Sequence, residues 1–489
     1  MRGTAVVLLA LVLTLITGCQ QGHRPDTAAV PSGPSSGAVG VEYSFSSSAD
    51  DHDGDDVAVR FDWGDGDTSD WSPWVRPGEA VAMNHFWAGL VVYAVRAQAK
   101  ARNFTISKWS DGHTYTALHA FIRTYGGQSD DECRSGQQTQ DGGYVVTGLT
   151  GSFGAGNGDV WLIKTDETGD TVWARTFGGP HWDGGNSVQQ TQDGGYVVVG
   201  STDGYGTSWG GILMVKTDAS GSVVWMRTFD GSDEDRGGMV RQTRDEGYII
   251  TGYTRPYGGG HANVWLIKTN ADGDVTWTRV FGGSDEDAGS AVQQTRDGGY
   301  IITGYTGSFG AGGADVWLIK TDADGDTVWA RTFGGAGDDR GSSVQQTQDG
   351  GFVIAGYTCS HGAGGRDVWL IKTDTNGDSV WTRTFGGAGS DYAVSVEETQ
   401  DGGYVIAGYT KSYGAGGTDA WLIKTDSMGD TVWTRTFGGT EADGFSAVQQ
   451  TQDGGYMLAG TTSSYGWGWA NFWLIKTDAE GRVNEGGGK

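Results

Sequence analysis

Seven aspartates recur at one fixed spacing and are the first candidates for chemistry. Each follows a short Gly-rich segment, and consecutive members lie 52 residues apart. If their carboxylates share one face of the protein, they could hold a cation or attract a basic partner. Alternatively, each side chain accepts hydrogen bonds from the backbone amides of its own loop, and we favour this structural role because one ligand rarely needs seven equal contacts. The seven residues are Asp131, Asp183, Asp235, Asp287, Asp339, Asp391 and Asp443.

Several aromatic residues in the longer connecting segments occur in one copy and are not shared by the equivalent positions of the other copies. A site for a single ligand should differ from copy to copy, and an exposed group of aromatic rings could stack on sugars or grip a peptide. The alternative is ordinary drift among repeats. We predict no catalytic residue, and we predict a binding site that involves a set of aromatic residues. They are Trp182, Trp209, Tyr392, Phe445, Trp467 and Trp469.

Other reactive motifs are missing from the sequence. We find no nucleophile–base pattern, Gly-Lys-Ser/Thr phosphate loop or zinc-binding helix. The cysteines Cys19, Cys133 and Cys359 lack zinc-site spacing, and we expect the last two to be free thiols. The acidic turn at 322–326 lacks the downstream Glu of an EF-hand, so we expect a hairpin turn there. No metal and no cofactor is predicted.

The candidate residues belong to a repeat of 52 residues. A representative copy is Tyr300–Gly334, which is led by an Asp-Gly-Gly-Tyr tetrad that starts at Asp297. A fixed period of this length indicates stacked supersecondary units. The same tetrad, or a close variant of it, starts at Asp141, Asp193, Asp245, Asp349, Asp401 and Asp453.

Each copy contains four strand-like runs and no segment with the apolar period of a helix. In the fourth copy, alternation and β-branched or aromatic content predict strands at 290–295, 300–306, 315–321 and 327–333. Short Gly-containing turns connect the first strand to the second and the third to the fourth, as in hairpins. The pattern predicts an all-β fold, a seven-bladed β-propeller of four-stranded antiparallel blades.

The two ends of the repeat array predict how the ring closes. The last copy ends after its third strand, Phe472–Asp478, whereas Phe121–Gly127 matches the fourth strand of the first copy, Trp173–Gly179. We therefore expect a strand at 117–125 to complete the last blade and to remove an exposed sheet edge. The propeller then spans 117–483, and 484–489 form a disordered tail.

Strand connectivity predicts two different faces of the propeller. The short turns of every blade share one face, and the longer loops share the other, where a ligand is expected to bind. The third strand of each blade carries a lysine, which could pair with acids of the neighbouring blade. These are Lys164, Lys216, Lys268, Lys320, Lys372, Lys424 and Lys476.

The N-terminal segment indicates export. Residues 1–18 have the shape of a signal peptide, with an apolar run too short for a membrane span. Ile16-Thr17-Gly18-Cys19 resembles the bacterial lipobox, which implies a lipid anchor on Cys19; the alternative is an ordinary cleaved signal. In proteins with a lipobox, an Asp after the Cys is associated with retention at the inner membrane. Residue 20 is Gln, so the resemblance favours the outer membrane or cell surface. Residues 19–37 are predicted to be the lipidated Cys and a flexible tether.

Residues 38–112 differ from the repeats and predict a small β-sandwich. Strand patterns flank the turn Trp63-Gly-Asp-Gly66, and Tyr93, Val95, Ala97 and Ala99 share one face of a later strand. These features resemble the PKD family of immunoglobulin-like domains. The resemblance implies a spacer or a module that contacts carbohydrate or protein.

The repeat itself has two further resemblances. The pattern Asp166-x-x-Gly169-x-x-x-Trp173 is similar to the docking motif of quinoprotein-type propellers, which supports the blade and not a quinone cofactor. The whole unit resembles bacterial and archaeal surface propeller repeats of the GG-x-x-DD and DGG-Y type. That resemblance implies no known reaction.

Composition narrows the possible partners. A formal charge of −27 argues against a nucleic-acid partner, which requires a basic surface. Our first hypothesis is a monomeric, lipid-anchored cell-envelope protein that binds a protein or glycan without catalysis. The alternatives are an extracellular carbohydrate-active enzyme and an outer-membrane assembly factor, which would resemble the eight-bladed lipoprotein propellers.

Overall fold

The computed structural model describes residues 23–89, 92–102, 104–118, 120–204, 210–231, 234–255 and 260–483. The chain forms two compact units, Met1–Leu118 and His119–Lys489. All regular structure in the described ranges is β, and these ranges contain no helix that could span a membrane. The predicted signal peptide, the predicted lipidation site at Cys19, Trp209 and the predicted tail at 484–489 lie outside the described residues.

The first unit is a β-sandwich with two sheets. One sheet has the order β1 (Ser36–Ala38), β6 (His113–Leu118), β5 (Val92–Ala101) and β3 (Val57–Asp62), and the other pairs β2 (Tyr43–Ser47) with β4 (Val81–His85). The aromatic core contains Phe45, Phe61, Trp63, Trp87 and Tyr115. The alternating residues of β5, from Tyr93 to Ala99, are buried as predicted.

Both predicted boundaries of the sandwich are wrong. The segment predicted to be a tether is hydrogen-bonded to the sandwich from Asp26, whose N–H donates to the carbonyl of Asp50, and it ends in β1, which pairs with β6. At the other end, Tyr115 of β6 is fully buried in the sandwich core. The polar composition of 19–37 concealed these backbone bonds, because edge strands need little apolar sequence.

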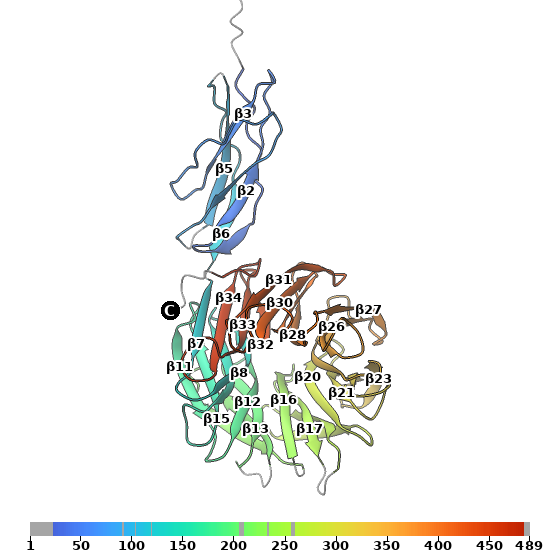
Figure 1. Ribbon diagram of the computed structural model, residues 1–489. Helices are drawn as coiled ribbons and strands as arrows, with labels where there is room; N and C mark the ends of the chain where they lie inside the picture. The colour runs from blue at the N-terminus through green and yellow to red at the C-terminus, as the bar shows by residue number, and fades with distance from the viewer. Residues whose placement is uncertain are drawn as a thin grey trace, which may run out of the picture. The chain divides into compact units, whose positions relative to one another are not determined.

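The second unit consists of seven four-stranded antiparallel sheets arranged as the blades of a propeller (Figure 1). Blade 1 comprises β8 (Asp131–Gln138), β9 (Tyr144–Thr150), β10 (Asp159–Thr165) and β11 (Thr171–Phe177). Blade 2 comprises β12 (Asp183–Gln190), β13 (Tyr196–Thr202), β14 (Gly211–Thr217) and β15 (Val223–Phe229). Blade 3 comprises β16 (Glu234–Gln242), β17 (Tyr248–Arg255), β18 (Asn263–Thr269) and β19 (Val275–Phe281).

The remaining blades repeat this pattern. Blade 4 comprises β20 (Asp287–Gln294), β21 (Tyr300–Thr306), β22 (Asp315–Thr321) and β23 (Thr327–Phe333). Blade 5 comprises β24 (Asp339–Gln346), β25 (Phe352–Thr358), β26 (Asp367–Thr373) and β27 (Ser379–Phe385). Blade 6 comprises β28 (Asp391–Glu398), β29 (Tyr404–Thr410), β30 (Asp419–Thr425) and β31 (Thr431–Phe437). Blade 7 comprises β32 (Asp443–Gln450), β33 (Tyr456–Thr462), β34 (Asn471–Thr477) and β7 (Phe121–Tyr125).

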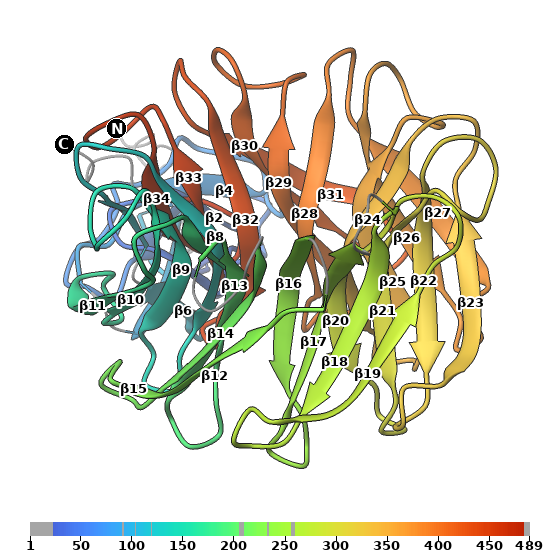
Figure 2. The ribbon, with the colours of Figure 1, turned by 90° about the horizontal axis from the view of Figure 1, so that it is seen from below.

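The first strand of each blade lines the centre of the ring, and the fourth lies at its rim (Figures 1 and 2). Three of the four strands predicted for blade 4 begin and end as predicted, but β20 begins at Asp287 instead of residue 290. A β-bulge between Gly289 and Ala291 shifts the register there. Because the bulge adds a residue, it interrupts the alternation that the prediction used.

The predicted closure of the ring is confirmed. Strand β7 pairs antiparallel with β34, with Tyr125 opposite Phe472 and Phe121 opposite Lys476. The strand begins at Phe121 and not at residue 117, because residues 113–118 form β6 of the sandwich. Blade 7 also contacts blade 1 directly through β32 and β8. The N-terminal strand of the unit thus completes its last blade.

Candidate functional site

The seven repeated aspartates are buried and bonded within their own loops. In blade 4, one carboxylate oxygen of Asp287 accepts the hydroxyl of Thr306, and the other accepts the Gly283 N–H at 2.9 Å and the Ser308 hydroxyl at 2.7 Å. This geometry matches the structural interpretation. All seven aspartates accept an N–H from the residue four positions earlier, namely Gly127, Gly179, Gly231, Gly283, Gly335, Gly387 and Gly439.

No ring of carboxylates therefore faces the solvent at these seven positions. Asp131, Asp287, Asp339 and Asp391 have no measurable exposed area, and the other three are at most 2% exposed. In the part of the chain that the structure describes, His, Cys, Asp and Glu side chains form no group of three that could hold a metal ion. The aspartates stabilise the loops that connect the blades.

The strand-three lysines pair within their own blade, which corrects the expected pairing with a neighbour. Lys372 lies 2.8 Å from Asp349, which is in the hairpin turn of the same blade. Partial burial alone would raise the pKa of Asp349, but hydrogen bonds from Lys372 and Thr347 outweigh it and lower the pKa to about 2. The lysine thus holds the first hairpin against the third strand.

Two of the predicted aromatic residues are largely exposed on the long-loop face. Trp467 and Trp469 lie in the loop between β33 and β34, and they are 79% and 80% exposed. Tyr465, in the same loop, is 48% exposed. This loop therefore presents three aromatic rings to solvent, as the sequence predicted for Trp467 and Trp469.

The other predicted aromatic residues are engaged inside the protein. Phe445 is 1% exposed and stacks on Trp473, so its assignment to a binding patch is wrong. Trp182 is half-buried between the guanidinium groups of Arg134 and Arg236, each 5.6 Å from its ring centroid.

Tyr392 is likewise half-buried. Its ring stacks on that of Tyr409 at 4.7 Å between centroids, and its hydroxyl accepts a hydrogen bond from Arg366. The predicted patch is thereby reduced, among the described residues, to Trp467 and Trp469.

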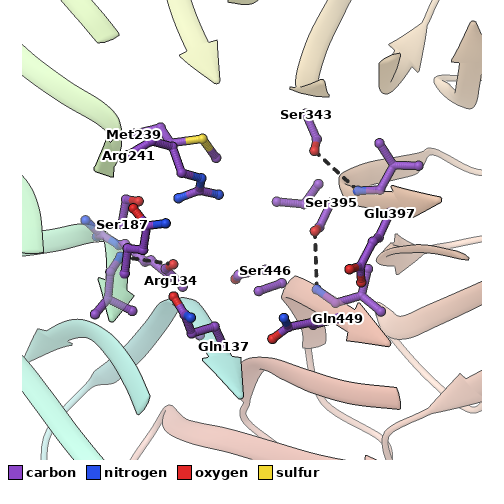
Figure 3. Close-up of a pocket in the computed structure, with 18 of the residues that line it drawn as sticks. Arg134, Gln137, Ser187, Met239, Arg241, Ser343, Ser395, Glu397, Ser446 and Gln449 are labelled. Carbon is purple, nitrogen blue, oxygen red and sulfur yellow. Dashed lines mark hydrogen bonds between the residues drawn. The ribbon is translucent and has the colours of Figure 1, made fainter. Parts of the chain in front are cut away.

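The central channel is lined by three charged residues that sequence reasoning missed, namely Arg134, Arg241 and Glu397. The inner strands enclose a cavity of about 290 Å³. One position of the repeat lines it in every blade, and this position changes from glutamine to Arg241 in blade 3 and to Glu397 in blade 6. Figure 3 shows these two side chains on opposite sides of the cavity. The seven residues at this position are Gln137, Gln189, Arg241, Gln293, Gln345, Glu397 and Gln449.

At this position most side chains link neighbouring blades. The side-chain oxygen of Gln293 accepts the N–H of Gln346 at 2.7 Å, and Glu397 accepts the N–H of Gln450 at 2.6 Å. The oxygens of Gln137, Gln189, Gln345 and Gln449 accept equivalent bonds. Arg241 has no acceptor atom, so it cannot make this link. Its guanidinium instead donates to the carbonyl of Val240 at 2.9 Å.

Arg241 and Glu397 have shifted pKa values. Burial lowers the pKa of Arg241 to about 10 and raises the pKa of Glu397 to about 7. Both side chains are partly accessible from the channel, although they lie deep below the outer surface. The only signal in the sequence is their departure from the glutamine shared by the other blades. A carboxylic acid with a pKa near 7 can exchange a proton at neutral pH.

Both cysteines of the propeller are free thiols. Cys133 is buried in blade 1, and Cys359 is exposed in the loop after β25. Burial raises the pKa of the Cys133 thiol to about 12, so it remains protonated at neutral pH. The thiol prediction made from the sequence agrees with these positions.

No protein-family model matches the chain. A stretch of 162 residues is 28% identical to the regulatory protein FlaEY of Caulobacter vibrioides, and it covers 28% of this chain and 17% of that protein. Among solved structures, the chain is similar to the PKD domain of an M14-like peptidase from Thermoplasmatales archaeon SCGC AB-540-F20. That match has 30% identity and a TM-score of 0.19, and it covers 20% of this chain and 97% of that domain.

The chain is also similar to the extracellular domain of BT3049 from B. thetaiotaomicron, described as a hybrid two-component system. The identity is 12% and the TM-score is 0.41, with 73% of this chain and 42% of that chain covered. The chain thus has a PKD domain among its structural neighbours, and these similarities assign it no ligand.

Proposed function

We propose that the protein is an exported, lipid-anchored component of the cell envelope that binds a glycan or a protein through the long-loop face of its propeller. Trp467 and Trp469 support this proposal best. The equivalent residues of the preceding blade are Ala415 and Gly417, so the two indoles depart from the repeat. Exposed indoles are costly in solvent and are common in recognition sites.

The proposed location rests on the sequence of the N-terminal segment. Residues 1–18 have the pattern of an export signal and Ile16–Cys19 resembles a lipobox, which supports a location at the outer membrane or cell surface. We propose a monomer without a nucleic-acid partner, in keeping with the formal charge of −27.

A carbohydrate-active enzyme is the second candidate, and the channel supports it. Glu397 has a pKa raised to about 7 and lines the same cavity as Arg241. A raised carboxyl pKa beside a cavity is typical of a general acid. Hydrolysis of a glycan that is abolished in Glu397→Gln and retained in Glu398→Gln would favour this candidate over simple binding.

Binding measurements test the first candidate. The full chain would be screened in detergent against glycans and envelope proteins, and each ligand found would be retested with Trp467→Ala/Trp469→Ala. Val328→Ala/Val432→Ala is the control, because these valines are 59% and 60% exposed on outer strands. We expect at least a tenfold loss of affinity in the tryptophan variant only. Equal binding by both variants would refute a role for this loop.

A further inference from the structure

A second cavity lies among the long loops of blades 3, 4 and 5. Its volume is about 480 Å³, within the range that is usual for small-molecule sites. Backbone from Gly307 and 312–314 forms one wall, so little side-chain bulk fills that side. The side chains that line it are those of Arg255, Asp285, Glu286, Tyr305 and Arg340.

Arg340 supplies a positive charge that lines this cavity. Its guanidinium carbon lies 4.0 Å from the ring centroid of Tyr305, and its Nε is buried without a hydrogen-bond partner. Among the described residues, none forms an ion pair with it. The equivalent residue of blade 3, Arg236, bonds to Glu234 at 3.1 Å. A guanidinium without an ion pair beside a cavity is a suitable site for an anion.

The acids of the cavity restrict which anion can bind. Glu286 is paired with Arg255 at 3.1 Å, and Asp285, whose side chain is 60% exposed, lies 3.7 Å from the His261 ring nitrogen. A multiply charged group such as phosphate would be repelled by these carboxylates. A ligand with one carboxylate and several hydroxyl groups suits both the arginine and the acids of the cavity. The carboxylate can bind the arginine, and Asp and Glu oxygens accept hydrogen bonds from the hydroxyls.

We infer that this cavity binds a saccharide that carries a carboxylate, such as a uronic acid. The guanidinium of Arg340, held in place by Tyr305, takes the carboxylate in the two-bonded geometry that the arginine fork favours. Asp285 and Glu286 accept hydroxyl groups of the sugar. The inference rests on the proposed glycan-binding function and gives it a ligand class. The cavity is separate from Trp467 and Trp469, so binding at one site can be refuted without refuting binding at the other.

Calorimetric titration of the full chain with a galacturonate trisaccharide tests this inference. Its methyl ester, which has the same size without the charge, and inorganic phosphate are the comparison probes. We expect the free acid to bind at least tenfold more tightly than the ester or phosphate. No binding of the free acid, or equal binding of the three probes, would overturn the inference.

Variants then locate the site. Arg340→Ala should weaken binding of the acid at least tenfold, and Arg340→Lys should retain part of it. Arg331→Ala is the control, because Arg331 is an arginine at the rim of blade 4 that pairs with Asp378 at 3.0 Å. Equal affinity of Arg340→Ala and Arg331→Ala would overturn the assignment. If Arg340→Ala does not fold, Arg340→Lys and Tyr305→Ala replace it as test variants. Affinity and salt dependence equal to those of the wild type in both variants would overturn the assignment. Trp467→Ala/Trp469→Ala should bind the acid as the wild type does.

Discussion

Gly325 of blade 4 lies directly against the indole ring of Trp277 of blade 3. A Cβ atom at Gly325 would approach the ring to 2.7 Å, and the residue has φ of +82° in the turn between β22 and β23. The same contact joins Gly377 to Trp329 and Gly429 to Trp381. Each blade is thus docked on its neighbour by a turn that has no side chain at the point of contact.

Gly325→Ala should destabilise the propeller. The added methyl group must displace the indole, and positive φ disfavours alanine, so we expect a loss of about 2–4 kcal/mol in the free energy of unfolding. Gly298→Ala is the matched control, because Gly298 has φ of +92° with nothing within 4 Å of its Cβ position. The difference between the two variants in denaturant unfolding isolates the contact. Equal midpoints would show that the docking is not tight.

The repeat made most of the fold predictable from sequence. Alternation and turn residues placed β21, β22 and β23 because those strands are regular, and the missing fourth strand of blade 7 identified β7. The bulge in β20 and the hydrogen bonds of the polar segment at 26–38 left no periodic signal. The local alternation of residues therefore predicted the regular strands and failed where a bulge changes the strand register.

The candidate sites were harder to predict, because the exposure of a side chain depends on the side chains that pack against it in three dimensions. Phe445 and Trp467 are both aromatic departures from the repeat, yet Phe445 packs on Trp473, while Trp467 faces solvent. Likewise, Arg340 has no ion pair among the described residues, whereas the equivalent Arg236 bonds to Glu234, whose counterpart in blade 5 is Asp338. Both contacts lie within one blade, between β32 and β34 of blade 7 and along β16 of blade 3, and the strand pattern of the sequence does not show which side chains meet there.

Phe121→Ala should weaken the closure of the ring. Phe121 is buried at the start of β7, and its ring lies 5.6 Å from that of Tyr144 in blade 1. Removal of a buried aromatic ring costs about 3–5 kcal/mol, and somewhat less near the edge of a sheet. We expect a lower unfolding temperature and faster proteolysis of the chain near β7. Val172→Ala, at an exposed position of β11, should leave both unchanged.

Asp287→Asn should lower stability without any link to calcium. The asparagine loses the charge-assisted bonds from Gly283 and Ser308, for an expected cost of about 1–3 kcal/mol. Thermal melts with and without millimolar Ca²⁺ provide the measurement, and Asp324→Asn in an exposed turn provides the control. A Ca²⁺-dependent stabilisation of the wild type that disappears in Asp287→Asn would restore the cation-binding interpretation.

Glu397→Gln should stabilise the protein at neutral and alkaline pH. Because burial raises the pKa of Glu397 from 4.5 to about 7, the native state binds this proton more tightly than the unfolded state. The free energy of unfolding therefore falls as pH rises from about 4.5 to 7 and stays reduced above that range. Glutamine keeps the oxygen that accepts the Gln450 N–H and is the residue used in five other blades.

We expect the free energy of unfolding of Glu397→Gln to exceed that of the wild type by about 1–3 kcal/mol at pH 8 and to equal it near pH 4. Solvent screening in the channel keeps this difference below the full free energy that corresponds to the pKa shift. Urea unfolding at several pH values measures this difference. Glu398→Gln removes the same charge from the next residue and controls for net charge. A pH-independent difference between Glu397→Gln and the wild type would mean that the channel carboxyl titrates alike in the folded and unfolded chains, and the acid–base role considered for it would lose its basis.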